Sequence, residues 1–198
     1  MTKPSYDECL IEAELRARAC YVEPGRRYHN QDHLDDCLQH LERVREITDG
    51  ERQLLRWALL WHDAIYDSQK SDNEEQSAEL ARLELATCSV DGDTIAEVAR
   101  LILLTKGHKV PEDDRLGALM VSIDLAILGA DPIRYEAYVR DVRREYAHVP
   151  DEAWRAGRSA VLQSLMADCI FADPEFRAEL EDQARANMSD ELRSLTAG

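Results

Sequence analysis

Four ionisable residues lie in apolar surroundings where side chains of their kind are rare: His33, the adjacent pair His62 and Asp63, and Asp124. A helix face that packs into a protein core excludes ionisable groups unless a partner offsets the cost of removing them from water. Two imidazoles and two carboxylates form a suitable ligand set for one divalent ion. The sequence therefore predicts a metal site built from these four residues.

Each of the four also has an ordinary structural explanation. A lone histidine on an apolar helix face is usually a satisfied core or surface residue, and we interpret His40 and His148 in that way. Asp63 could form a salt bridge beside its histidine, and Asp124 could cap a helix or pair with an arginine. It is the full set, in this order within a helical chain, that favours a metal.

The elements that must position these residues are all predicted to be helices. Apolar residues recur with the 3.6-residue period, and stretches of alternating Val, Ile and Thr are missing. A capping box at Ser5 and Glu8 predicts a first helix that ends before Pro24. We expect further helices over about 28–49, 54–65, 72–91, 95–107 and 116–128, and after Asp131, Asp151 and Asp173. The fold class is all-α.

Bulk composition narrows the function classes. The 198 residues suit one domain, and no apolar run approaches the roughly 20 residues that cross a bilayer. With 24 Lys and Arg against 40 Asp and Glu, the formal charge of −16 disfavours binding to nucleic acid polymers or membranes. Residues 1–8 lack a secretory signal. Five scattered cysteines suggest reduced, buried thiols in a cytoplasmic protein, without a catalytic or metal role: Cys9, Cys20, Cys37, Cys88 and Cys169.

The order His33, His62-Asp63, Asp124 on helices resembles the HD superfamily of metal-dependent phosphohydrolases. Residues 28–33, Tyr-His-Asn-Gln-Asp-His, also resemble the Tyr-His-Asn-x-x-His segment of cyclic nucleotide phosphodiesterases, a branch of that superfamily. There the second histidine binds metal and the first donates a proton to the leaving group. The resemblance thus implies His33 as a ligand and His29 as general acid, with His29 and Asp63 the catalytic residues.

The resemblance implies a compact, HD-domain-like helical bundle, with its metal-site core at about 25–130 and C-terminal helices 131–198 packed on it. The chain as a whole resembles small bacterial proteins described as predicted HD-type hydrolases. The implied reaction is hydrolysis of a small phosphorylated metabolite or nucleotide, with a divalent ion (Mn, Mg, Co, Ni, Zn or Fe) activating water. An HD-type di-iron oxygenase and a metal-containing binding or sensing module without turnover stay open as alternatives. So does a homodimer.

The number of metals is also open, because dinuclear HD branches place two extra histidines between the doublet and the last aspartate. Here only His108 lies there. It is a second-site ligand, a substrate contact or a loop histidine. Asp67, Asn73 and Glu74 either support the site or belong to a solvated helix start.

Cationic side chains are needed to bind substrate charge beyond the metal. Lys106 is one candidate. Arg143, which lies beside the apolar stripe of its helix, and Arg158, which follows Gly157, are favoured. The alternative is that these arginines pair with acidic neighbours at the surface.

Overall fold

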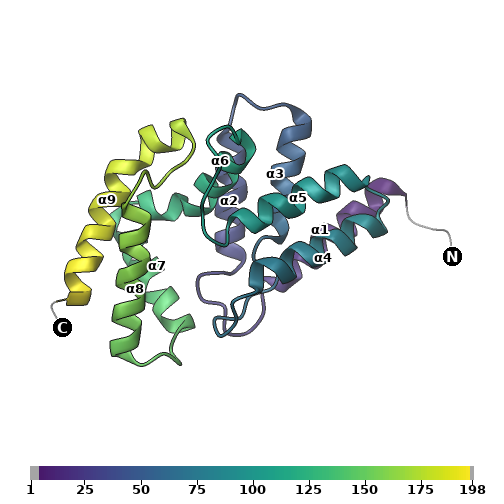
Figure 1. Ribbon diagram of the computed structural model, residues 1–198. Helices are drawn as coiled ribbons and strands as arrows, with labels where there is room; N and C mark the ends of the chain where they lie inside the picture. Colours follow the sequence, from purple (N-terminus) through teal and green to yellow (C-terminus); the bar gives the residue numbers. More distant parts are fainter. Residues whose placement is uncertain (1–4, 197–198) are drawn as a thin grey trace.

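The computed structural model describes residues 5–196, and within that range the chain is all-α, as predicted (Figure 1). Two short segments lie outside the described range, residues 1–4 and residues 197–198. The first belongs to the segment that we predict to lack a secretory signal. The helices are α1 (Tyr6–Cys20), α2 (Gln31–Arg43), α3 (Asp49–Trp61), α4 (Asn73–Thr87), α5 (Gly92–Leu104), α6 (Arg115–Asp124), the 3₁₀ helix η1 (Leu125–Gly129), α7 (Pro132–Glu145), α8 (Asp151–Met166) and α9 (Pro174–Thr196).

Two apolar clusters hold the helices together. One is formed mainly by α1 to α6 and includes the fully buried Trp61 and Ile102; the other joins η1 to α7, α8 and α9 around Phe171 and Met188. Figure 1 shows α7 to α9 on one side of α2 and α6, with α1, α3, α4 and α5 on the other. Phe176 packs against both clusters. Of the predicted metal residues, His33 and Asp124 therefore belong to the middle helices α2 and α6, and His62 and Asp63 directly follow α3.

Several predicted helix starts are confirmed. Ser5 and Glu8 form the expected capping box of α1. The side chains of Asp131 and Asp173 accept hydrogen bonds from the first-turn N–H groups of α7 and α9, and a proline follows each aspartate. For α8, in contrast, Pro150 holds the cap position and Asp151 is the first helical residue.

The predicted helix ends at 49 and 91 are wrong, because the Asp-Gly pair at each place begins a helix. Asp49-Gly50 instead begins α3, where Thr48 forms a capping box with Glu51. Likewise Asp91 accepts the N–H of Thr94 at 3.0 Å and so caps the start of α5. Aspartate is as favourable before a helix as glycine is after one, and here the aspartate determines the outcome.

Two helix boundaries near the site are unusual. Asp72 precedes α4 but its side chain makes no cap, and Glu75 pairs with Lys106. After α5 the left-handed conformation that often ends a helix is adopted by His108, with φ 54°, and not by the neighbouring Gly107. That conformation costs a residue with a side chain about 1 kcal/mol or more.

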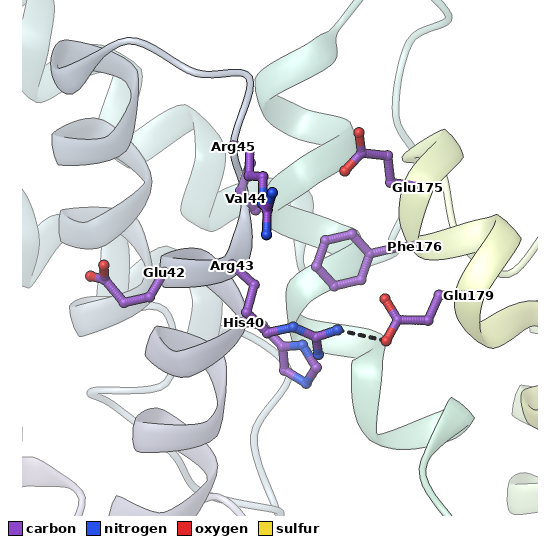
Figure 2. Close-up of a pocket in the computed structure, with 8 residues that line it drawn as sticks. All are labelled: His40, Glu42, Arg43, Val44, Arg45, Glu175, Phe176 and Glu179. Atoms are coloured by element: carbon purple, nitrogen blue, oxygen red, sulfur yellow. Dashed lines mark hydrogen bonds and ion pairs between the residues drawn. The ribbon is translucent and has the colours of Figure 1, made fainter.

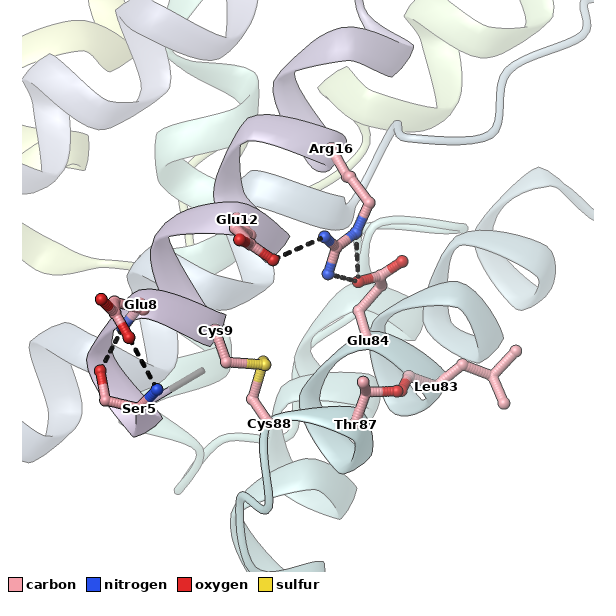
Figure 3. Close-up of a disulfide and its surroundings, with 9 residues drawn as sticks. All are labelled: Ser5, Glu8, Cys9, Glu12, Arg16, Leu83, Glu84, Thr87 and Cys88. Atoms are coloured by element: carbon pink, nitrogen blue, oxygen red, sulfur yellow. Dashed lines mark hydrogen bonds and ion pairs between the residues drawn. A yellow bond between two sulfur atoms is a disulfide. The ribbon is translucent and has the colours of Figure 1, made fainter. Parts of the chain in front are cut away.

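The prediction of five reduced cysteines is wrong for one pair. Cys9 of α1 and Cys88, directly after α4, form a disulfide (Figure 3). The other three cysteines are free. The sequence missed the pair because 79 positions separate the two residues, and packing of α1 against α4 is what brings them together. The cytoplasmic location, which rested partly on reduced thiols, stays a prediction.

Within residues 5–196, no single helix has the length and apolar character needed to cross a membrane. The segments Arg115–Gly129 and Pro132–Glu145 meet those criteria only when taken together, as a pair bent by 104°.

Candidate metal centre

His33 is positioned by the first turn of α2. The Asn30 side chain caps this helix by accepting the N–H groups of Asp32 and His33 at 2.8 and 3.4 Å. The imidazole is buried, and the ring of Tyr28 lies against it with 4.8 Å between ring centroids. The helix start and this aromatic neighbour together fix the direction of the ring.

The doublet His62-Asp63 lies in the turn that ends α3, not inside a helix as predicted. His62 faces the Leu59 carbonyl oxygen at 2.8 Å through Nδ1, and donation of that N–H leaves Nε2 free as a ligand. The buried guanidinium of Arg26 donates to the carbonyl oxygens of Asp63 and Ala64 at 2.6 and 2.8 Å. Arg26 thus holds the turn that presents both side chains.

The four predicted ligands face one point. Nε2 of His33 and Nε2 of His62 are 3.1 Å apart, and Asp124 Oδ1 lies 3.4 and 3.5 Å from them. Asp63 Oδ2 lies 3.6 and 3.2 Å from the same two nitrogens. Two nitrogen or oxygen ligands of one tetrahedral ion are about 3.3 Å apart when each is about 2.0–2.1 Å from it. The donor set therefore fits a shared divalent cation.

Cys37 joins this cluster, although the sequence gave no cysteine a metal role. Donor atoms of His33, Cys37, His62 and Asp124 all lie within 4.8 Å of one another in a buried group that could bind a metal ion. Asp63 is outside that particular group, yet it is closer to His62 Nε2 than Asp124 is. We therefore keep it among the candidate ligands.

The carboxylates of the cluster are held in their charged form. Burial raises the pKa of Asp124, but hydrogen bonds from His108, His33 and His62 outweigh burial and bring the pKa well below its usual value. For Asp63 the balance is similar: burial is opposed chiefly by the charge of His62, and the pKa is lowered. Two half-buried anions beside buried imidazoles make a site that favours a cation.

His29 lies in the loop before α2, so its position does not follow from helical spacing with His33 as predicted. Its Nδ1 is 2.6 Å from Oε2 of the buried Glu145, and its ring stacks on Tyr66 with centroids 4.1 Å apart. Burial lowers the pKa of His29, but the hydrogen bond to Glu145 and the charge of Asp63 outweigh it and raise the pKa. His29 is thereby favoured in its protonated form.

A cavity of 380 Å³ opens beside the cluster and brings several predicted residues together. Its lining contains His29, Asp63, Tyr66, Lys70, Ser71, Asn73, Glu74, Thr105, Lys106, His108 and Tyr146. Asp67 is not in the lining, but Asn73 donates to its carbonyl oxygen and accepts from its N–H. Asn73 and Glu74 thus line the opening, and Asp67 lies outside it.

His108 is connected directly to the cluster, since its Nε2 lies 3.1 Å from Oδ2 of Asp124. The left-handed backbone of His108 places its ring there. Backbone strain in a residue that also faces a ligand cluster is typical of functional sites.

The two favoured arginines lie elsewhere. Arg143 donates to the carbonyl oxygens of Tyr146 and Val149 and pairs with Asp151 at 2.7 Å, so it closes the connection from α7 to α8. Arg158 is buried against Glu191 of α9. Neither lines the cavity at the cluster. Both arginines instead hold the C-terminal helices and their connection in place.

Sequence reasoning missed Arg26, Glu145 and Lys70 as site residues. Glu145 Oε1 accepts the N–H groups of Arg27, Tyr28 and His29, across more than one hundred positions of sequence. No local pattern marks such a contact. From the sequence, Glu145 is only one of the acidic neighbours with which the arginines could pair at the surface. Lys70 could have been found by its place between the doublet and Asn73.

A second cavity, of 420 Å³, lies between the end of α2 and the start of α9, away from the metal cluster. Figure 2 shows Phe176 facing His40 there, beside the ion pair of Arg43 and Glu179. Charges of both signs line this cavity and largely offset each other. It contains none of the predicted site residues.

Comparison of the chain with models of known protein families gave no match, and neither did comparison with curated proteins. The resemblance to HD phosphohydrolases therefore rests on the sequence pattern, and the structure adds a group of donors that could bind a metal ion.

Proposed function

We propose that this protein is a metal-dependent phosphohydrolase that acts on a small phosphorylated metabolite or a nucleotide. The observation that carries the proposal is that Asp63 of the cluster and the anchored His29 line the same cavity. A divalent ion bound by His33, His62, Asp63 and Asp124 would supply an activated water and offset phosphate charge.

His29 has the attributes of a general acid. The Glu145 carboxylate binds Nδ1, so Nε2 is the ring nitrogen left for the substrate. Glu145 also accepts a hydrogen bond of 2.9 Å from the Tyr66 hydroxyl, and the Tyr66 ring stacks on the His29 imidazole. These contacts fix the carboxylate against the histidine. A histidine held protonated at the edge of the cavity can give its proton to the departing oxygen of a phosphate ester.

Two lysines also lie in the cavity lining. Lys106 donates to the Ser71 carbonyl oxygen at 2.7 Å and its charge is offset by Glu75. Lys70 is exposed in the same lining. In a chain of formal charge −16, Lys70 supplies a positive charge that can attract a small anion to the cavity. This supports a phosphorylated substrate.

Turnover assays test the proposal. Purified protein is loaded separately with Mn²⁺, Mg²⁺, Co²⁺, Ni²⁺, Zn²⁺ and Fe²⁺ and assayed on phosphomonoesters, phosphodiesters and nucleotides. We expect phosphate release with at least one metal, abolished in Asp63→Ala. The matched control is Asp67→Ala, which changes a nearby carboxylate that lies outside the cavity lining.

Two outcomes would contradict the proposal. One is a folded, metal-loaded protein that releases no phosphate from any substrate. The other is two irons per chain after anaerobic purification together with oxygen consumption, which would favour the oxygenase alternative.

A further inference from the structure

We propose that the Cys37 thiolate is a ligand of the ion held by His33, His62 and Asp124, and that it makes the centre select Zn²⁺, Co²⁺ or Fe²⁺ over Mg²⁺ and Mn²⁺. This inference rests on the metal centre of the proposed function but not on hydrolysis. It adds a sulfur donor to a set otherwise made of nitrogen and oxygen.

The geometry of α2 supplies the first argument. Cys37 follows His33 by four residues, so both side chains lie on one face of the helix. Cys37 Sγ is 3.8 Å from each ring nitrogen of His33. It also belongs to the group whose donor atoms all lie within 4.8 Å of one another.

Bond lengths supply the second argument. A zinc–sulfur bond is about 2.3 Å and a zinc–nitrogen bond about 2.0–2.1 Å, so the two donors of a tetrahedral ion are about 3.6 Å apart. The observed 3.8 Å between Cys37 Sγ and His33 Nε2 is close to this separation, but Sγ is equally far from Nδ1 and so lies beside the ring. Binding of the ion therefore requires Sγ to move toward the space that Nε2 faces.

Cys37 approaches the centre from the side away from the cavity. Cys37 is 1% exposed and is not in the lining of the cavity that contains His29 and Asp63. Sulfur would therefore bind from the closed side of the centre. With His33, His62 and Asp124 it would complete a set of four ligands, so a water on the cavity side would make the ion five-coordinate. Cys20 provides the contrast, because its thiol is partly exposed and faces the Arg16 carbonyl oxygen at 3.5 Å.

The chemistry follows from ligand softness. A thiolate is a soft donor that binds zinc, cobalt or iron in preference to magnesium or manganese, which favour oxygen ligands. As the metal–sulfur bond forms, the thiol releases its proton to solvent, so no oxidant or other reactant is needed. A centre with this donor would keep its ion when magnesium is in excess.

Cobalt absorption spectroscopy of the full chain tests the inference. Wild-type protein titrated with Co²⁺ should show visible ligand-field bands together with a near-ultraviolet thiolate-to-cobalt charge-transfer band. Cys37→Ser and Cys37→Ala should lose the charge-transfer band and keep the ligand-field bands, and circular dichroism should show that both are folded. Cys20→Ser and Cys169→Ser are the matched controls and should keep both sets of bands.

Competition gives a second measurement. Cys37→Ser should weaken Zn²⁺ binding by at least about tenfold while Mn²⁺ binding changes by less than about threefold. Ligand-field bands that vanish in His33→Ala, without a charge-transfer band in wild type, would overturn the sulfur ligand and leave the metal centre intact. A charge-transfer band in a protein without turnover would support the ligand and contradict the hydrolase. Absence of any Co²⁺ binding would overturn both.

Discussion

Two buried polar clusters in this molecule balance charge in opposite ways. Between the C-terminal helices, Arg158 contacts both carboxylate oxygens of Glu191 at 2.7 and 3.0 Å, and Tyr135 donates to the same carboxylate at 2.5 Å. One cation meets one anion, so this cluster is complete. At the metal centre, in contrast, no Lys or Arg of the described residues forms an ion pair with Asp63 or Asp124, and their charges face histidines.

The difference shows which buried charges suggest function. A complete ion pair holds helices in place, and removing one partner leaves the other as a buried, unpaired charge. A cluster with excess negative charge and a cavity beside it can instead accept a cation and a substrate. The metal centre has both features, and the Arg158 cluster has a matched charge instead.

The largest expected effect comes from the metal centre. Asp124→Asn keeps the size of the side chain but removes a charged ligand, so phosphate release should fall by at least about 10⁴-fold, or more than about 5 kcal/mol of transition-state stabilisation. Metal analysis should find less bound ion. Thermal unfolding should no longer respond to added Zn²⁺, whereas wild type gains about 4 kcal/mol at 1,000 times its Kd. An unchanged metal content would contradict the centre.

The C-terminal cluster should respond in stability and not in metal binding. Arg158→Met leaves Glu191 buried without its cation and should lower the free energy of unfolding by about 3–5 kcal/mol, measured by urea denaturation. The double variant Arg158→Met/Glu191→Leu should recover most of that loss. A stable Arg158→Met protein with impaired substrate binding would instead place this arginine in the site, as the sequence suggested.

These two clusters also show what the sequence could and could not reveal. Asp124 was selected as a site candidate because its helix is apolar, and Arg158 was selected as a cation that could bind substrate charge. Local pattern identifies a residue that needs a partner, but which partner it has depends on how distant helices pack. Glu191 lies 33 positions from Arg158, and only the fold brings the two together.

For the fold and for the site, local pattern predicted local features but not contacts between distant segments. The all-α class followed from periodicity, and the caps at Ser5, Asp131 and Asp173 followed from local hydrogen bonding. Contacts made over long distances, such as Glu145 to His29 and the disulfide of Cys9, left no local trace. The family resemblance grouped His33 with His62, because the motif of a family records residues that its fold brings together.

An intermediate effect is expected where a complete ion pair adjoins the metal centre. Glu145→Gln removes the charge that raises the pKa of His29, so His29 should lose its proton at lower pH. Turnover that needs protonated His29 should then fall at lower pH than in wild type, with a loss of about 10–100-fold at the wild-type optimum. A pH–rate profile with an unshifted alkaline limb would show that His29 is not the acid.

Stability of the same variant provides an independent readout. The pKa of His29 is raised above 6.5, so its contribution is complete below pH 6.5 and is lost as pH rises through the raised value. The pKa of Glu145 is lowered from 4.5 to about 2, since burial is outweighed by its hydrogen bond from His29; its contribution is complete above pH 4.5. The stability difference between wild type and Glu145→Gln should therefore be widest between pH 4.5 and 6.5.

The smallest effect is expected at the cavity rim, where charge is exposed and screened. Lys70→Ala should raise KM for an anionic substrate by about three- to tenfold with little change in kcat, because an exposed lysine attracts the anion but is distant from the reacting atoms. Added salt should reduce this difference, since screening weakens exposed charges first. Lys109→Ala, which removes an exposed charge outside the lining, is the control. Equal effects from both substitutions would mean that only overall charge matters, and that the rim, unlike the buried centre, has no specific site for the anion.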